Sequence, residues 1–309
     1  MTSILIIGEC MLELKAQDEH SLSKSFAGDT YNSAVYAKRW FADAKVSYFS
    51  AVGTDEFSQQ MVQRWQQENI DTEWVLESQT AQVGIYSIHT DEAGERSFAY
   101  WRKGSAATQM MQLLGDKRQG LIDAGFDCLY FSGLSLAILS DEDKQALIDL
   151  VADIRAKGCK VAFDPNYRAR MWRDKEHAIE WLEKAYAVSD ILFPGLEDHE
   201  DMLGQSTKDA VVDYVSQYKV SESVVKCGKD GVYVVENGAD EVHLPFTPAP
   251  VQVDATAAGD SFAGTYLASR LSGNSTEQAV KDAANVAGFV VQHRGAIVDI
   301  DVFRQAFPA

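Results

Sequence analysis

Residues 254–264 read Asp-Ala-Thr-Ala-Ala-Gly-Asp-Ser-Phe-Ala-Gly and lead into an apolar periodic run, residues 262–271, that predicts a helix. The small residues Ala257, Ala258 and Gly259 fall where this helix should begin, so a ligand could approach the backbone closely there. N–H groups at a helix start lack intrahelical acceptors, and the helix dipole adds positive potential at the same end. The stretch therefore predicts an anion site of the kind that holds a phosphate.

Asp260 lies at the same helix start. An acid in a first turn stabilises a helix, and this structural role is one interpretation of the residue. The other interpretation is a catalytic base held beside a bound phosphate. Three small residues directly before the acid favour the base, because a structural carboxylate does not need them.

Short apolar segments alternate with helical patterns along most of the chain. This alternation predicts an α/β fold in which helices cover both faces of a parallel sheet. We predict strands at residues 4–7, 46–52, 127–131, 160–163 and 191–193, and helices at residues 31–41, 57 to about 68, 142–156, 177–188, 262–271 and 277–292.

Residues 83–90 and 96–102 interrupt this alternation, because no helix separates the two strand patterns. The polar residues 91–95 between them predict the turn of a β-hairpin. A hairpin inserted in an α/β chain often forms a lid or a contact between subunits. We expect one domain over residues 1–309, with a β lid formed mainly by residues 83–102 and the segment after the first strand.

The composition restricts the partners of the chain. With 28 basic and 46 acidic residues, the formal net charge is −18, which argues against nucleic acid or an anionic membrane as a partner. An anionic substrate would therefore need a local cluster of basic residues. The four scattered cysteines predict buried free thiols in a reducing cytoplasm, and we expect neither a signal peptide nor a membrane span.

Residues 28–32, Gly-Asp-Thr-Tyr-Asn, form a second junction between a turn and a helix. Asp29 or Thr30 could serve there simply as the N-cap of the helix. Asn32 is harder to explain as a cap, and it indicates a group that binds a ligand. No GxxxxGK[ST] or GxGxxG motif occurs, so the two common phosphate-binding loops are not supported.

In combination, four motifs resemble the ribokinase-like (PfkB) carbohydrate kinases. Residues 254–264 are similar to the family's C-terminal DTxGAGD signature, and residues 27–32 to its GGxxxN motif. Residues 52–55 match VGxD, and residues 228–231 match the GxxG turn. The resemblance implies a ribokinase-like three-layer α/β/α sandwich with a small β-sheet lid, and ATP and Mg²⁺ as cofactors.

The resemblance also implies a role for each matching residue. Asp260 would take the proton of a sugar hydroxyl. The backbone N–H groups from Ala257 to Asp260 would neutralise charge on the transferred phosphoryl group. The residues implied at the sugar are Gly28, Asp29, Thr30, Tyr31, Asn32, Tyr86, Tyr100, Trp101, Arg102 and Arg168. The residues implied at the nucleotide are Asn166, Arg168, Lys226, Gly228, Lys229, Gly231 and Asn285, together with Ala257, Ala258 and Gly259.

Within the family, residues 28–32, 100–102 and 164–168 are similar to 2-keto-3-deoxygluconate kinases. A sugar acid needs a cation for its carboxylate, and arginine binds carboxylates with two parallel hydrogen bonds. We therefore expect Arg102, with Arg168 as second candidate, to bind that group. The alternatives are an exposed charge at a sheet edge for Arg102 and a solvated loop charge for Arg168. A fructokinase, or another neutral-sugar kinase, is the alternative activity, and a non-catalytic sensor is the alternative class.

The chain also departs from the family pattern. Ala27 and Ala257 replace glycines, and we expect a negative φ at Ala257 unless strain is stored there. The family's NxxE motif, which helps to organise Mg²⁺, aligns with residues 195–198, where Gly195 replaces Asn and Asp198 replaces Glu. The metal-binding residues stay unassigned. The resemblance also allows a K⁺ site near residues 254–256.

Overall fold

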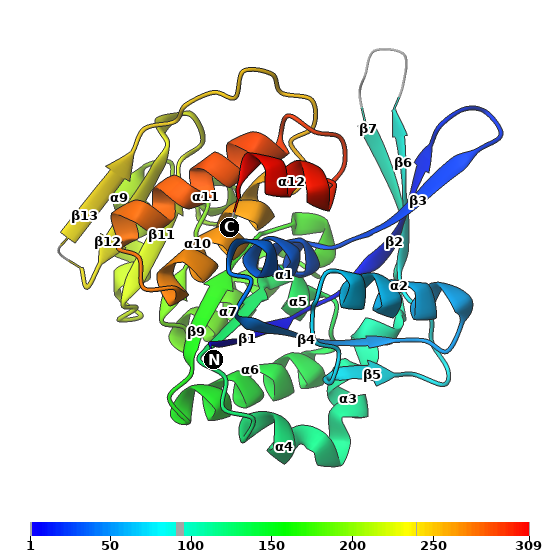
Figure 1. The fold of residues 1–309 in the computed structure, drawn as a ribbon. Coiled ribbons are helices and arrows are strands. Elements are labelled where there is room, and N and C mark those ends of the chain that lie inside the picture. Colours follow the sequence, from blue (N-terminus) through cyan, green and yellow to red (C-terminus); the bar gives the residue numbers. More distant parts are fainter. Residues whose placement is uncertain (1, 91–95, 239, 309) are drawn as a thin grey trace.

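The computed structural model describes residues 2–90, 96–238 and 240–308. Its largest element is a nine-stranded sheet with the order β13-β12-β11-β10-β9-β8-β1-β4-β5 (Figure 1). In that order the strands are Asp240–Leu244, Val232–Glu236, Glu222–Lys226, Ile191–Leu192, Lys160–Asp164, Cys128–Ser132, Ser3–Ile7, Lys45–Val52 and Val75–Glu77.

Every neighbouring pair of strands from β5 to β11 is parallel, whereas β11, β12 and β13 pair in antiparallel fashion. The sheet is therefore mixed, because two antiparallel strands that the sequence did not predict extend the predicted parallel sheet at this edge. The antiparallel step is possible because a tight turn joins β11 to β12. Gly231 in that turn has φ 91°, and a Cβ atom there would lie 2.1 Å from the carbonyl oxygen of Leu244.

Two helical layers cover the sheet, as the alternation along β1 shows. Leu5 and Ile7 point into the hydrophobic core with α3 to α9, and Ile4 and Ile6 point into the core with α1, α2, α10 and α11. The three-layer α/β/α prediction is confirmed. The first layer contains α3 (Met110–Leu114), α4 (Arg118–Ile122), α5 (Gly133–Ala137), α6 (Asp141–Ala156), α7 (Lys175–Ala187), α8 (Leu196–Leu203) and α9 (Lys208–Ser216). The second contains α1 (Asp29–Trp40), α2 (Glu56–Gln67), α10 (Ala258–Leu271) and α11 (Thr276–Val290), with α12 (Ile300–Ala306) packed against α1 and α11 through Phe303.

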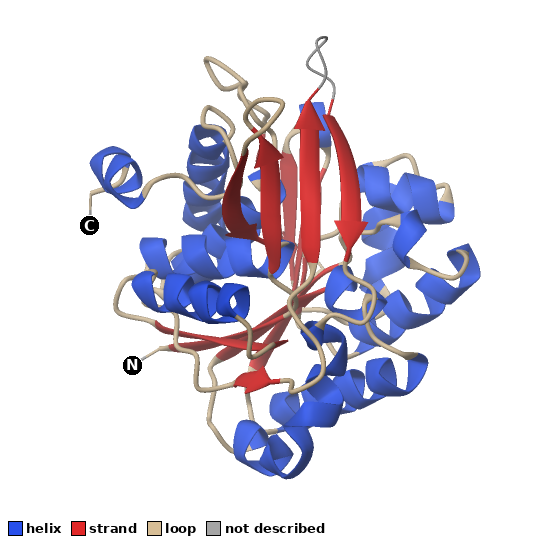
Figure 2. Cartoon of the chain, turned by 90° about the vertical axis from the view of Figure 1, so that its right-hand side faces the viewer, coloured by secondary structure: helices blue, strands red, loops and turns tan. Residues whose placement is uncertain are grey.

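A second, four-stranded sheet stands beside the main body (Figures 1 and 2). Its order is β3-β2-β6-β7, so the segment after the first strand joins the predicted hairpin. The predicted turn at residues 91–95 lies outside the described residues. The strands are β2 (Met11–Ala16), β3 (Leu22–Ala27), β6 (Ile85–Thr90) and β7 (Arg96–Trp101).

Two close backbone approaches bring distant segments together. A Cβ atom on Gly264 of α10 would lie 2.1 Å from the carbonyl oxygen of Ser33 in α1, so these helices can cross only where a glycine stands. A Cβ atom on Gly28 would lie 2.2 Å from the carbonyl oxygen of Glu9. The start of α1 is therefore packed between α10 and the segment that links β1 to β2.

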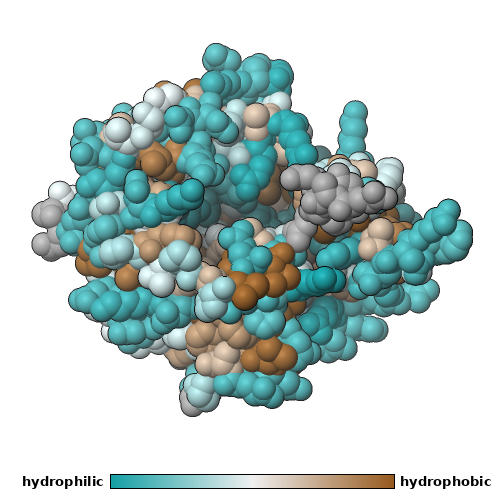
Figure 3. Space-filling model, turned by 90° about the horizontal axis from the view of Figure 1, so that it is seen from above, coloured by the Kyte–Doolittle hydropathy of each residue, from teal (hydrophilic) through white to brown (hydrophobic). Residues whose placement is uncertain are grey.

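The surface and the cysteines agree with the composition. The face in Figure 3 is mostly hydrophilic, with apolar side chains in small separate groups. All four cysteines are buried and free, as predicted. Within the described ranges, no helix combines the length and the apolar character that a membrane crossing requires.

Candidate active site

Asp260 lies at the crossing of α1 and α10, where it contacts the second predicted junction directly. Its Oδ2 accepts a hydrogen bond of 2.8 Å from Asn32 Nδ2, and its carbonyl oxygen accepts one of 3.0 Å from Ser33 Oγ. The glycine contact between Gly264 and Ser33 permits this approach. The structure thus joins the two sequence motifs, 228 residues apart, into one site.

The start of α10 carries open backbone donors. No side chain caps the helix, and within the described chain the amides of Gly259 and Asp260 have no hydrogen-bond acceptor. A Cβ atom placed on Gly259 would meet no atom within 4 Å, so there is room beside these amides. A helix start with free donors and open space can hold an anionic group.

Ala257, directly before α10, has φ 62°. The predicted negative φ is not observed, and the structure adopts the strained alternative. A left-handed conformation costs an alanine about 1–2 kcal/mol, because its Cβ atom approaches the following carbonyl oxygen. Ala257 is also buried in a small hydrophobic cluster that includes Tyr86 and Ala296, and this packing helps to hold the conformation.

A chain of polar contacts runs from residues 28–32, the motif implied at the sugar, to Lys226, which directly precedes the turn implied at the nucleotide. Asn166 Nδ2 donates to Asp29 Oδ2 at 2.9 Å, and the Asn166 amide donates to Asp164 Oδ1 at 3.0 Å. The other oxygen of Asp164 accepts a bond of 2.6 Å from Lys226 Nζ. Three acids therefore interact with one lysine here, because the charge of Lys226 also acts on Asp198 and Asp260.

These surroundings raise the pKa of Asp260 to about 7. Burial is the largest cause, although part of the residue remains open to solvent, and the carboxylates of Asp29 and Asp164 add to it. The hydrogen bond from Asn32 and the charge of Lys226 oppose the rise. A carboxyl group with a pKa near neutrality suits a general base better than an ordinary aspartate does.

Not every residue of the sugar motif faces this site. Thr30 is fully buried and its Oγ1 lies 3.0 Å from the hydroxyl of Tyr48. Tyr31 is also fully buried, and its ring packs against Trp65 at a centroid distance of 5.8 Å. The structure therefore places both side chains in the core, because they lie on the inner face of α1. Gly28, Asp29 and Asn32 remain on the ligand side.

The predicted lid residues divide between the two faces of the small sheet. Tyr86 and Tyr100 pair across β6 and β7, with ring centroids 5.8 Å apart. Side chains alternate along a strand, so Trp101 must point to the opposite face from Tyr100. Trp101 is 61% exposed there and lines a separate surface cleft with Lys103.

Arg102 is not the exposed edge charge of the alternative interpretation. Its side chain is 14% exposed, and its Nη2 forms an ion pair with the buried carboxylate of Glu9. Its Nε is buried without a partner, and its Nη1 has only a weak contact of 3.8 Å with the sulfur of Met171. The guanidinium group therefore keeps donors for a second carboxylate.

Sequence reasoning missed two buried acids on the segment after β1. Glu9 accepts from Arg102 and, at 2.5 Å, from Ser105 Oγ, and Glu13 accepts from Tyr86 and, at 2.7 Å, from Ser25 Oγ. Glu13 interrupts an otherwise apolar stretch, residues 10–14, and Glu9 directly precedes it. An acid in such a stretch is itself a signal, since a buried carboxylate needs a partner.

Arg168 has a half-exposed side chain that lies 3.6 Å from Asp198, measured between Nη1 and Oδ1. Asp198 is the residue that aligns with the family's metal motif, and burial raises its pKa. Within the described residues, no three His, Cys, Asp or Glu side chains converge as a metal site. Mg²⁺ that arrives with nucleotide phosphates requires only one or two carboxylates, so the acids present are compatible with it.

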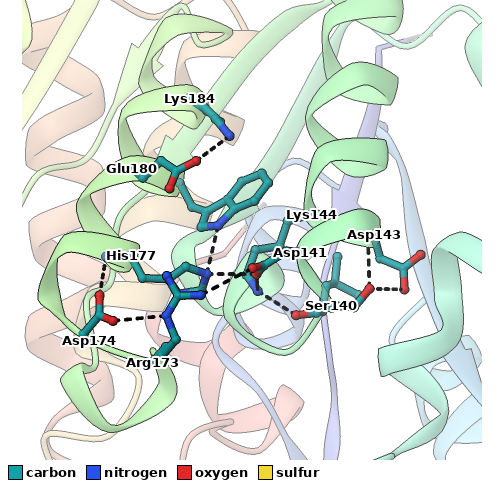
Figure 4. A network of polar contacts seen from close by, with 11 residues as sticks. Ser140, Asp141, Asp143, Lys144, Arg173, Asp174, His177, Glu180 and Lys184 are labelled. Carbon is teal, nitrogen blue, oxygen red and sulfur yellow. Dashed lines mark hydrogen bonds and ion pairs between the residues drawn. The ribbon is translucent and has the colours of Figure 1, made fainter.

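The segment that carries Asn166 and Arg168 is anchored by a network at the starts of α6 and α7 (Figure 4). Asp141 Oδ1 lies 2.9 Å from His177 Nε2 and accepts a bond of 3.0 Å from Lys144 Nζ. The same lysine donates to the carbonyl oxygen of Leu139 at 2.7 Å. These contacts join the helix before the segment to the helix after it.

Four of the predicted nucleotide residues lie at the end of β11 or in the turn that follows it, namely Lys226, Gly228, Lys229 and Gly231. Gly228 begins a short 3₁₀ turn, and Lys229 is exposed beside it. Asn285 lies exposed on α11. The turn η4 spans Gly228–Asp230, and the remaining 3₁₀ turns of the described chain are η1 (Ala106–Gln109), η2 (Gly115–Lys117) and η3 (Ala169–Met171).

An acid with a raised pKa at a helix start, open amide donors beside it and a three-layer α/β/α fold with a second small sheet fit a kinase of small molecules. The model of the pfkB family carbohydrate kinases matches residues 1–302, so the chain belongs to this family. It is 40% identical over 312 residues to the 2-dehydro-3-deoxygluconokinase of Escherichia coli strain K12, covering 99% of both chains. It is 39% identical over 303 residues to the enzyme of the same name from Dickeya dadantii, covering 97% of both. The crystal structure of a PfkB protein from Polaromonas superposes with a TM-score of 0.84 over all of both chains, at 26% identity.

Proposed function

We propose that this protein transfers the terminal phosphoryl group of ATP to the terminal hydroxyl of 2-dehydro-3-deoxygluconate, also called 2-keto-3-deoxygluconate. The products are ADP and 2-keto-3-deoxy-6-phosphogluconate. The observation that carries the proposal is the position of Asp260, held by Asn32 beside the open amides at the start of α10. The names of the similar enzymes support the choice of substrate.

In the proposed reaction, Asp260 accepts the proton of the terminal hydroxyl as its oxygen attacks the γ-phosphorus of ATP. The bond between that phosphorus and the oxygen of the leaving ADP breaks. The amides of Gly259 and Asp260 would stabilise charge on the transferred group, since positioning and electrostatics do most of the work in phosphoryl transfer. Mg²⁺ would offset the charge of the phosphates, and no residue is assigned to it.

The proposed binding residues divide between the two substrates. Gly28, Asp29 and Asn32 would bind sugar hydroxyls, and Tyr86, Tyr100 and Arg102 would approach the sugar from the small sheet. Arg168 would lie where the sugar and the phosphates meet. The proposed nucleotide side comprises Asn166, Lys226, Gly228, Lys229, Gly231 and Asn285, together with residues 257–259.

A direct assay separates the proposal from its rivals. Purified protein with Mg-ATP should phosphorylate 2-dehydro-3-deoxygluconate with a much higher kcat/KM than fructose. A preference for fructose would replace the proposal by a neutral-sugar kinase of the same family. Binding of ATP and a sugar without turnover would indicate a non-catalytic sensor. The ionisable Asp260 at the helix start argues against this alternative.

Arg102→Ala is expected to raise the KM for the sugar acid roughly tenfold to a hundredfold, the value of a charge-assisted hydrogen bond. The KM for fructose should change much less, and the KM for ATP should stay nearly constant. The carboxylate lies far from the reacting hydroxyl, so its binding is similar in the ground and transition states. Steady-state kinetics with both sugars measure this difference.

The ion pair with Glu9 requires a control for that experiment, because the substitution leaves a buried carboxylate unpaired. The double variant Glu9→Gln, Arg102→Ala removes the unpaired charge. It should recover thermal stability while the KM for the sugar acid stays high. Equal losses for acid and neutral sugar would show that Arg102 does not bind the carboxylate.

The reaction should slow on the acid side of neutrality. Asp260 works as a base only when it is ionised, and its raised pKa of about 7 means that protonation begins at a higher pH than for an ordinary aspartate. The kcat/KM for the sugar acid, at saturating Mg-ATP, should therefore rise with pH, reach about half of its plateau near pH 7 and level off only above that pH. Thermal unfolding at each pH controls for loss of folded protein. A profile that stays flat down to pH 5 would contradict the assignment.

Finer assignments complete the proposal. The small sheet would act as a lid, and slower hydrogen exchange at residues 83–90 and 96–102 on addition of the sugar acid tests this. Exposed apolar side chains on the sheet, Leu22, Phe98 and Trp101, support a homodimer or higher homo-oligomer formed through it, which sedimentation would detect.

Turnover in K⁺ against tetramethylammonium tests a K⁺ site near residues 254–256. The four free thiols support a cytoplasmic location, which localisation of a tagged chain would check.

A further inference from the structure

We propose that Asp164, the last residue of β9, is a positioning residue that fixes the two halves of the active site relative to each other. The inference rests on the proposed function, because it takes Lys226 as part of the phosphate side and Asn166 as the link to the sugar side. Asp164 is only 5% exposed, so its carboxylate interacts with the protein and hardly with water. Each of its oxygens has a different partner, Asn166 N for Oδ1 and Lys226 Nζ for Oδ2.

On the sugar side, Asp164 stabilises an unusual turn. Asn166 has φ 36°, a region that residues other than glycine seldom occupy. The bond of 3.0 Å from the Asn166 amide to Asp164 Oδ1 is the Asx type of contact that holds such turns. In this conformation Asn166 Nδ2 reaches Asp29 Oδ2 at 2.9 Å. Asp164 thus orients, through Asn166, an acid that lies beside Asp260.

On the phosphate side, Asp164 decides where the ammonium group of Lys226 lies. Lysine is a flexible point charge with three donors. Asp198 and Asp260 are near enough to compete for it, since its charge acts on both. The contact of 2.6 Å with buried Asp164 uses one donor and leaves the others for phosphate oxygens. It also keeps the ammonium group from pairing with Asp260.

The charges around Asp260 give this arrangement a measurable signature. The Asp164 carboxylate acts on Asp260 directly, and it also restrains the opposing Lys226. Loss of the carboxylate should therefore favour the ionised form of Asp260 in two ways. The titratable or charged groups that face Asp260 are Asp29 and Tyr36 on α1, Tyr130 on β8, Asp164 on β9 and Lys226 on β11.

The test compares Asp164→Asn with Lys226→Met. Both variants should bind ATP roughly tenfold or more weakly in calorimetry without sugar, because Lys226 is misplaced in one and absent in the other. The acid limb of kcat/KM should move in opposite directions. In Asp164→Asn it should move to lower pH by about half a unit or more, and in Lys226→Met to higher pH. Shifts in the same direction, or an unchanged ATP affinity in either variant, would overturn the proposal.

Asp190→Asn is the matched control. Asp190 also accepts from a cation, Arg155, and from a backbone amide, that of Val161 at 2.9 Å. It lies beside the first residues of β9, however, and Asp164 is the last. This variant should lose stability without any change in ATP affinity or in the acid limb. If the protein prefers another sugar, the ATP measurement is unaffected and the limb is measured with that sugar. If Asp164→Asn does not fold, Asp164→Ser takes its place, with the same expected loss of ATP affinity and the same direction of the limb.

Discussion

Replacement of Asp260 by asparagine is expected to lower kcat by at least ~10²-fold, the usual loss when a general base is removed. Asparagine has the same shape, and its Oδ1 can still accept the bond from Asn32 that Asp260 now accepts at 2.8 Å. It cannot take a proton from the sugar hydroxyl. The fold and the affinity for ATP should therefore change little. Single-turnover kinetics measure the loss of rate, and calorimetric titration measures the affinity for ATP.

The control addresses the structural interpretation of the residue. Asp209 is also an acid in the first turn of a helix, α9, and it is exposed beside Lys208. Asp209→Asn should change stability by less than about 1 kcal/mol, the usual size of a helix-dipole effect, and leave kcat unchanged. If Asp260→Asn behaves like Asp209→Asn and keeps near-normal turnover, Asp260 is only a helix-stabilising acid.

Gly264→Ala should damage both stability and catalysis. The new Cβ atom would lie 2.1 Å from the carbonyl oxygen of Ser33, and no rotamer change can move a backbone atom away. Helices α1 and α10 must therefore separate, at a cost of about 1–3 kcal/mol for overpacking. The separation also displaces Asn32 from Asp260, and a misplacement of about 1 Å at a reacting group can cost roughly 10²-fold in rate.

Gly288→Ala is the matched change, since Gly288 also lies inside a helix, α11, but has no atom within 4 Å of a built Cβ. It should raise stability by about 0.5–1 kcal/mol through helix propensity and leave kcat unchanged. Urea unfolding and steady-state kinetics on both variants give the comparison. Unchanged stability in Gly264→Ala would mean that the helices cross with more space than the structure shows.

The sequence predicted the features that depend on local pattern. Alternating apolar segments located β1, β4, β8, β9 and β10, and small residues before Asp260 located the start of α10. The antiparallel strands β12 and β13 were missed, because their half-buried sides give a weaker apolar pattern than the central strands. Pattern alone likewise cannot show that an edge of the sheet reverses direction.

Features that depend on distant partners could not be predicted. The motif resemblance brought Tyr31 into the predicted site, but its position on the inner face of α1 depends on Trp65, which is in α2. The pairing of Arg102 with Glu9 joins residues 93 positions apart. Asp164 was passed over for a similar reason, since its importance comes from Lys226 on another strand. Side-chain facing and partner choice are tertiary properties, and periodicity contains no information about them.

The contact between Asn32 and Asp260 also has a consequence for biosynthesis. Its two residues are separated by 228 positions, so the first half of the site leaves the ribosome long before the second. At about 5–20 residues per second, roughly ten to fifty seconds pass before Asp260, the proposed base, is synthesised. During that interval the face of α1 that packs against α10 is uncovered. A truncated product that ends before residue 260 lacks the proposed base, and it exposes the helix face that the missing segment would have covered.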